Sequence, residues 1–117
     1  MSHFVIYHNP RCSKSRATLA LLQDQGIEPE VVLYLESPLD SGQLQALLKK
    51  LGITAGQLVR RGEAQFKALG LGAHSSDKEL LAAMADHPKL IERPIVVCGD
   101  RAVLGRPPES VLELINE

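Results

Sequence analysis

The 117-residue sequence lacks any strong excess of charge and any long apolar run. Its formal net charge of −1 gives no reason to expect nucleic acid as an electrostatic partner. The longest wholly apolar runs are short, such as residues 31–33 and 95–98, so no segment is long enough to span a bilayer. The N-terminus has neither a basic leader nor a long apolar stretch, so a secretory signal is not expected. These absences predict a cytoplasmic location and no membrane partner.

Cysteine and histidine are also scarce. The two cysteines, Cys12 and Cys98, lie far apart, and without a secretory signal they indicate a reducing compartment rather than a disulfide framework. Both thiols are therefore expected to be free. The four histidines show no metal-ligand spacing with one another or with the cysteines, so we expect no metal site.

The order of the expected elements indicates an α/β fold. Residues 3–8 read as a buried strand, a helix begins at Ser13, and residues 30–35 read as a second strand, which the short connection places parallel to the first. Near the end, two apolar runs joined by Gly99 and Asp100 predict a β-hairpin, followed by a closing helix over residues 109–116. This βαβ–ββα order is that of a thioredoxin/glutaredoxin-like fold. The length predicts a single domain, residues 1–117.

The middle of the chain, at about residues 40–90, reads as a helical insertion. Asp40 or Ser41 can cap a helix that ends at Gly52. Two shorter helical stretches follow, and Ser76 with Glu79 forms a capping-box pattern that opens a helix to about residue 87.

Cys12 is the strongest candidate for chemistry. It follows a strand and stands at the N-terminus of a helix, where free backbone N–H groups and the helix dipole favour the thiolate. Arg11, Lys14 and Arg16 surround it, although cations are themselves unfavourable at a helix N-terminus. The alternative is a small buried hydrophobic residue, but the polar and cationic neighbours favour a nucleophile.

The hairpin supplies an independent clue. In a two-residue turn at Gly99 and Asp100, the register places Cys98 opposite Arg101 and Arg93 opposite Arg106. Two arginines directly across a strand pair repel each other, and an oxyanion between them would relieve the repulsion. Otherwise, both would extend into solvent or pair with nearby glutamates, Glu92 and Glu109.

The same hairpin argues against a partnership between the two cysteines. In thioredoxin-like folds a cis-proline precedes the strand beside the active cysteine, and the Arg93-Pro94 bond is the candidate. Cys98 lies four residues further on, which at about 3.3 Å per residue is some 13 Å away. A disulfide with Cys12 could not span that distance, so we expect no role for Cys98.

Five stretches spread over nearly the whole chain form an ordered set of motifs: "YHNPRCSKSRATLALL", "VLYLESP", "LVRRGEAQFKALGL", "HPKLIERPIVV" and "GRPPESVLELI". They closely resemble the glutaredoxin-linked arsenate reductase (ArsC-like) family, and most of all an uncharacterised subgroup of it. In that family the cysteine of an Asn-Pro-x-Cys motif attacks arsenate, and three arginines hold the oxyanion and product.

The resemblance assigns roles to individual residues. It implies that Cys12 is the nucleophile and that His8 helps to keep it ionised. It implies that Arg60, Arg93 and Arg106 bind the substrate. Without the resemblance, the sequence around Arg60 indicates only a solvated helical face. An auxiliary oxyanion loop would consist of Asn9, Lys14, Ser15 and Arg16.

The implied reaction is reduction of arsenate, or of another small oxyanion, to arsenite by a redox-active cysteine. Glutathione serves as co-substrate, glutaredoxin completes the reduction, and no bound cofactor is expected. One cysteine suffices because the second thiol comes from solution, consistent with Ser15 at the place of a dithiol enzyme's second cysteine. At the positions that match residues 12–16, the best-known members of the family read Cys-Gly-Thr-Ser-Arg, and those members also carry a C-terminal extension. Lys14 differs from the threonine of those members, and this difference bears on the substrate.

Two other functions remain open at this point. A glutathione-dependent thiol-disulfide oxidoreductase acting on protein mixed disulfides would need Cys12 but no arginine cluster. A non-enzymatic redox adaptor, like the related regulators that contact RNA polymerase, usually carries a Cys-x-x-Cys switch, which Ser15 removes.

Overall fold

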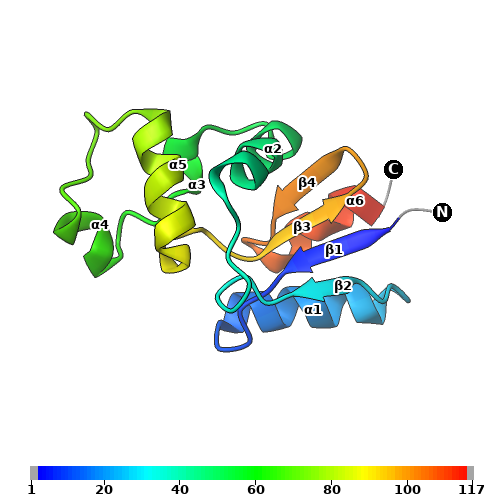
Figure 1. The fold of residues 1–117 in the computed structure, drawn as a ribbon. Helices are drawn as coiled ribbons and strands as arrows, with labels where there is room; N and C mark the ends of the chain where they lie inside the picture. Colours follow the sequence, from blue (N-terminus) through cyan, green and yellow to red (C-terminus); the bar gives the residue numbers. More distant parts are fainter. Residues whose placement is uncertain (1–2, 116–117) are drawn as a thin grey trace. The chain divides into compact units, whose positions relative to one another are not determined.

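Four short strands form one mixed sheet in the computed structural model, which describes residues 3–115 (Figure 1). The strands are β1 (Phe4–Tyr7), β2 (Glu30–Val32), β3 (Ile95–Cys98) and β4 (Arg101–Leu104), arranged in the order β2-β1-β3-β4. β1 pairs with β2 in parallel and with β3 antiparallel, and β3 pairs antiparallel with β4. The predicted βαβ–ββα order of elements and the thioredoxin-like fold are confirmed. β2 is shorter than expected, because the Glu36 and Ser37 N–H groups both donate to the Leu33 carbonyl and turn the chain.

The register of the β3–β4 hairpin is the predicted one. Cys98 lies opposite Arg101 and Ile95 lies opposite Leu104. Gly99 has φ +62°, in the left-handed region that two-residue hairpin turns favour. Beyond the strands, the Gly105 N–H donates to the Pro94 carbonyl at 2.9 Å. The register therefore continues to the residues next to Arg93 and Arg106.

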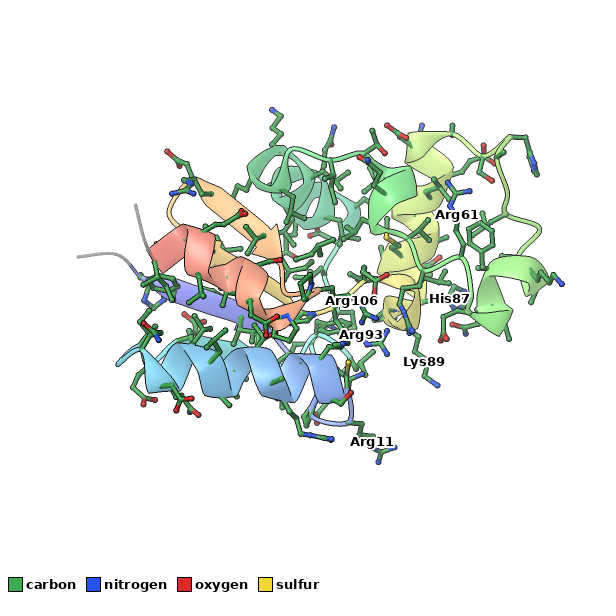
Figure 2. The ribbon with its side chains drawn as sticks, turned by 180° about the vertical axis from the view of Figure 1, so that it is seen from behind. Arg11, Arg61, His87, Lys89, Arg93 and Arg106 are labelled. Carbon is green, nitrogen blue, oxygen red and sulfur yellow. The ribbon has the colours of Figure 1, made fainter. Side chains whose placement is uncertain are left out.

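The chain divides into two compact units, and the sheet belongs to the first, which comprises residues 1–37 and 93–117. Helix α1 (Ser13–Asp24) and the C-terminal segment, a 3-10 turn η2 (Pro108–Val111) and helix α6 (Leu112–Ile115), cover one face of this sheet (Figure 2). Their shared core consists of Ile6, Leu22, Val96, Val111 and Leu114. The end of the predicted closing helix, residue 116, lies outside the described residues.

The second unit, Pro38–Glu92, is helical. Its elements are α2 (Ser41–Leu51), α3 (Ala55–Leu58), α4 (Ala64–Ala68), α5 (Asp77–Asp86) and a 3-10 turn η1 (Pro88–Leu90). Asp40, Thr54 and Ser76 each begin a helix with a reciprocal capping box, and Gly52 ends α2 with φ +69°. The single domain over residues 1–117, with a helical insertion at about residues 40–90, stays a prediction.

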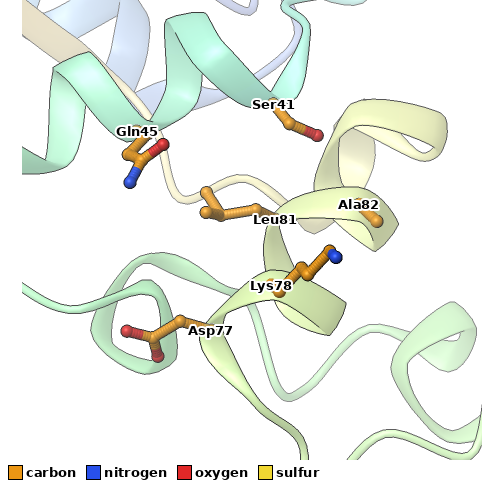
Figure 3. Close-up of a pocket in the computed structure, with 6 residues that line it drawn as sticks. All are labelled: Ser41, Gln45, Asp77, Lys78, Leu81 and Ala82. Carbon is orange, nitrogen blue, oxygen red and sulfur yellow. The ribbon is translucent and has the colours of Figure 1, made fainter.

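The second unit also has an open hollow of about 540 Å³ between α2 and α5 (Figure 3). Its lining residues are Ser41, Gln45, Asp77, Lys78, Leu81 and Ala82. It contains none of the residues predicted from the sequence to act in catalysis or binding. Over residues 3–115, the helices are all too short or too polar to cross a membrane.

The capping box at Asp40 gives a test of the second unit. The Asp40 carboxylate accepts the Gln43 N–H at 2.8 Å, and the Gln43 side chain accepts the Asp40 N–H at 3.0 Å. Asp40→Ala should lower the free energy of unfolding by about 1 kcal/mol, whereas Asp40→Asn should stay within a few tenths of it. Urea denaturation followed by circular dichroism measures both, and equal stability of the alanine variant and the parent would contradict the expectation.

Candidate active site

Cys12 occupies the N-cap position of α1, at the end of the loop that follows β1. Asn9 shapes this loop, because its carbonyl accepts the Cys12 N–H and its side-chain oxygen accepts the Arg11 N–H, each at 3.0 Å. Pro10 fits the turn between them, since it has no N–H to satisfy. Cys12 itself is only 8% exposed. The fold thus presents a largely buried thiol at the positive end of a helix.

The pKa of the Cys12 thiol reflects a balance between burial and positive charge. Burial is the largest influence and raises the pKa. The Ser15 N–H, the charge of Arg93 and the Lys14 N–H lower it, as does a hydrogen bond from the Arg93 side chain. Cys12 makes no cap hydrogen bond of regular geometry, so the N–H groups act mainly as dipoles close to the sulfur. Together they outweigh burial, and the pKa lies below its ordinary value.

Arg93 is the guanidinium beside this sulfur, and part of its hydrogen-bonding capacity is unused. Its Nε and Nη1 atoms are buried and have no hydrogen-bond partner among the described residues. Buried donors in folded proteins are nearly always satisfied, and an unsatisfied one costs about 1–3 kcal/mol, more when it is charged. A small anion bound next to Cys12 would provide acceptors for both nitrogens. This is the strongest sign of an oxyanion site in the first unit.

Arg106 lies next to Arg93, as the hairpin register predicts. Its Nη1 donates to the Arg93 carbonyl at 3.3 Å, and both arginines precede a cis-proline, Pro94 and Pro107. Figure 2 shows Arg93 and Arg106 together at the N-terminal end of α1, whereas Arg11 points outward. Two guanidinium groups that share one edge of the unit with a thiolate can hold an anion with several negatively charged oxygens.

His8 is buried and contacts Ser15 rather than the thiol. Its Nδ1 lies 2.6 Å from the Ser15 hydroxyl, which also accepts the Asn9 N–H at 3.0 Å. Burial, followed by the charge of Arg16, lowers the pKa of His8, which favours the neutral ring at neutral pH. A neutral ring adds no positive charge near the sulfur. His8 thus holds the Ser15 hydroxyl, and the predicted catalytic role of His8 stays a prediction.

The other cations of the loop differ in what they contact. Arg16 Nη1 donates to the Pro10 carbonyl at 3.1 Å and thereby holds the loop against the start of α1. The side chains of Arg11 and Lys14 are exposed, and Lys14 approaches the sulfur through its backbone N–H. Arg16 is thus the cation of this loop whose side chain stabilises the loop by a hydrogen bond.

Arg60, the third predicted arginine, belongs to the second unit. Its side chain is 25% exposed and lies 3.5 Å from the Glu63 carboxylate and 3.7 Å from that of Glu92. Backbone pairing supports this arrangement, because the Arg60 N–H donates to Leu90 and the Glu92 N–H donates to Leu58. The predicted part of Arg60 in substrate binding stays a prediction.

Several residues that contact or adjoin the predicted site residues were not expected from the sequence. Glu63 was not expected to pair with Arg60, and Thr18 and Gly105 were not singled out although they contact each other at 3.3 Å. A usable signal existed for Thr18: Ser15, Thr18 and Leu22 are spaced to share one helix face, and all three are buried. Hydroxyl groups on a buried helix face indicate specific hydrogen bonds. Within residues 3–115, no three His, Cys, Asp or Glu side chains gather where they could hold a metal ion.

Comparison with known proteins identifies the relatives of this chain. The model of the ArsC family matches residues 7–114. The protein YfgD of Escherichia coli K12 is 57% identical over 113 residues, covering 95% of each chain. An arsenate reductase of Haemophilus influenzae is 50% identical over 113 residues, covering 95% of this chain and 97% of the relative. The structure of an arsenate reductase from Vibrio cholerae superposes with a TM-score of 0.93 at 54% identity, covering 96% of this chain and 97% of that one.

Substitution of Arg93 tests the electrostatic balance at Cys12. Arg93→Met keeps much of the side-chain length but removes the charge, so the pKa of Cys12 should rise and burial should dominate. The rate of alkylation by iodoacetamide follows the thiolate fraction, so its pH profile should move to higher pH. At a pH below both midpoints the variant should react more slowly than the parent.

Arg101→Met is the matched control, because it removes one charge at the other end of the same hairpin, opposite Cys98. Its alkylation profile should coincide with that of the parent. Identical profiles for Arg93→Met and the parent would show that Arg93 does not help to ionise Cys12.

Proposed function

The chain belongs to the ArsC family, and we propose that it is a thiol-dependent arsenate reductase with Cys12 as its nucleophile. The observation that carries this proposal is the pairing of a thiol of lowered pKa with a neighbouring arginine whose buried Nε and Nη1 lack partners among the described residues. A thiol-disulfide exchange enzyme needs the first feature but not the second. Arsenate supplies the acceptors that these two nitrogens lack.

In the first step, the Cys12 thiolate attacks the arsenic of bound arsenate. A sulfur–arsenic bond forms, one oxygen leaves as water after protonation, and arsenic remains pentavalent. Arg93 and Arg106 neutralise the charge that builds up on the remaining oxygens. The dipole of α1 acts in the same sense, because its N-terminus faces the reacting sulfur.

The loop before α1 completes the proposed oxyanion site. Asn9 fixes its turn, Arg16 braces it through Pro10, and Ser15 contributes its N–H while its hydroxyl is held by His8. Lys14 contributes its backbone N–H to this site, since that N–H helps to lower the pKa of Cys12. These contacts keep the loop in one shape before the substrate arrives, which lowers the cost of binding.

We extend the proposal to Arg60, because Arg60 lies in the motif "LVRR" and matches the third of the family's substrate-binding arginines. The distances of 3.5 and 3.7 Å to Glu63 and Glu92 exceed the usual hydrogen-bond range, so the two carboxylates hold Arg60 mainly by charge. Its N–H groups keep the capacity to donate to an oxyanion.

In the second stage, we propose that glutathione attacks the cysteine-bound arsenic, so that a second sulfur–arsenic bond forms and another oxygen leaves as water. The glutaredoxin thiolate then attacks the sulfur of this glutathione, a mixed disulfide forms, and the electron pair of the broken sulfur–arsenic bond stays on arsenic, which becomes trivalent. Water replaces the Cys12 sulfur on arsenic, so arsenite leaves and Cys12 returns as a thiolate. Within the chain, Ser15 cannot supply a second thiol, which favours a reductant from solution.

A coupled assay tests the proposal directly. The protein is incubated with arsenate, glutathione, glutaredoxin, glutathione reductase and NADPH, and NADPH oxidation is followed. Arsenate-dependent turnover is expected, and Cys12→Ser should reduce it to background because a serine hydroxyl is not ionised near neutral pH. Absence of turnover with the parent protein would contradict the assignment.

The arginine pair separates the proposed function from thiol-disulfide exchange. Arg93→Met should lower kcat/KM for arsenate by about 100-fold to 1,000-fold, as expected for loss of a donor that stabilises a developing oxyanion. It should leave the reduction of a glutathionylated peptide nearly unchanged, provided that both assays are run at a pH where Cys12 is ionised in parent and variant. Equal losses in the two assays would favour a general oxidoreductase.

A further inference from the structure

Thr18 connects α1 to the segment that carries Arg106. Its side chain is fully buried, and its hydroxyl donates to the Lys14 carbonyl at 2.8 Å and to the Gly105 carbonyl at 3.3 Å. One hydroxyl proton is thus shared between two acceptors, one within the helix and one 87 residues away in sequence. The bond to Lys14 alone would satisfy the hydroxyl, so the contact with Gly105 is an additional link between two elements.

The contact between Thr18 and Gly105 is possible only because Gly105 lacks a side chain. A Cβ at position 105 would lie 2.5 Å from the Thr18 Oγ1 and 2.8 Å from the Cγ of Pro94. Both distances are far below van der Waals contact. Gly105 also donates its N–H to the Pro94 carbonyl at 2.9 Å. Thr18, Gly105 and Pro94 therefore form one close-packed cluster, named the Thr18 cluster below.

Each member of the Thr18 cluster adjoins part of the candidate site. Pro94 follows Arg93 in the chain, Gly105 precedes Arg106, and Thr18 lies on the helix that Cys12 caps. Movement of Gly105 away from α1 would carry Arg106 with it. Since Gly105 is hydrogen-bonded to Pro94, Arg93 would shift relative to the sulfur as well.

We propose that Thr18 is a positioning residue, which fixes the distance from Cys12 to Arg93 and Arg106 through Gly105 and Pro94. Its hydroxyl bonds to the backbone carbonyls of Lys14 and Gly105, so it acts through the backbone of the two segments that carry Cys12 and the arginines. A misplacement of about 1 Å far from the reacting atoms can cost about 100-fold in rate, so one buried hydroxyl is sufficient for such an effect. The effect on arsenate rests on the proposed function, whereas the effect on Cys12 does not.

The test compares Thr18→Val with Thr18→Ser. Valine has nearly the same shape but cannot donate, and its methyl group presses on Gly105, so α1 and Gly105 should separate. The pKa of Cys12, measured from the pH profile of alkylation, should rise in Thr18→Val and remain at the parent value in Thr18→Ser. The KM for arsenate should increase about tenfold in the valine variant, and the serine variant should restore it.

Thr54→Val is the control for a general loss of stability. It removes the threonine hydroxyl that caps α3 in the second unit, where it accepts the Gln57 N–H at 3.3 Å. This variant should melt at a lower temperature without any change in the alkylation profile. If Thr18→Val behaves in the same way, with a lower melting temperature but an unchanged pKa of Cys12, then Thr18 has only a structural role and the proposal is wrong.

Gly105→Ala provides a second route to the same answer if Thr18→Val fails to fold. Its Cβ must displace Thr18 or Pro94, so the alkylation profile should shift to higher pH, as in Thr18→Val. An unchanged profile in a folded Gly105→Ala would overturn the proposal. Because the alkylation profile needs no arsenate, a protein that lacks arsenate turnover but shows these shifts would refute the proposed function and leave the role of Thr18 intact.

Discussion

The lowered pKa of the Cys12 thiol is the feature on which the rest of the site depends. Burial alone would raise the pKa of this thiol, and the N–H groups at the start of α1 together with the guanidinium of Arg93 lower it below its ordinary value. The two contributions come from segments about 80 residues apart in the chain. Ionisation therefore requires that the loop after β1 and the entry to β3 be held together. The parallel β1–β2 pair and the antiparallel β1–β3 pair supply that framework.

The unfavourable interaction between the cationic side chains near the start of α1 and the positive end of the helix dipole is reduced in two ways. Arg16 turns back to the Pro10 carbonyl, and the side chains of Arg11 and Lys14 extend into solvent, where their charges are screened. Arg93 and Arg106 are different, because the hairpin register forces them together beside the thiolate. A bound oxyanion would offset the positive charge of this pair, as the proposed function requires.

The sequence predicted those features that arise from local rules. The Gly99-Asp100 turn determines the hairpin register and with it the Arg93–Arg106 pair, and Ser76 and Glu79 mark the start of α5. It did not predict the Thr18 cluster or the ion pairs of Arg60, since these depend on residues brought together by tertiary packing. The partner of His8 was missed for a related reason: a seven-residue separation across a turn has no periodic signal, and only the folded loop brings Ser15 to it.

The placement of the second cysteine bears on which thiol could act after Cys12 in the proposed reaction. Cys98 pairs with Phe4 at the start of β1, whereas Cys12 follows the end of that strand. Three residues of extended chain already separate the two ends of β1 by about 10 Å, well beyond the reach of a disulfide. Ser15, at the position where a second thiol would be adjacent, is instead committed to His8 and Asn9. A bond formed at Cys12 can therefore be resolved only by a thiol from solution, which is the role that glutathione and glutaredoxin have in the proposed reaction.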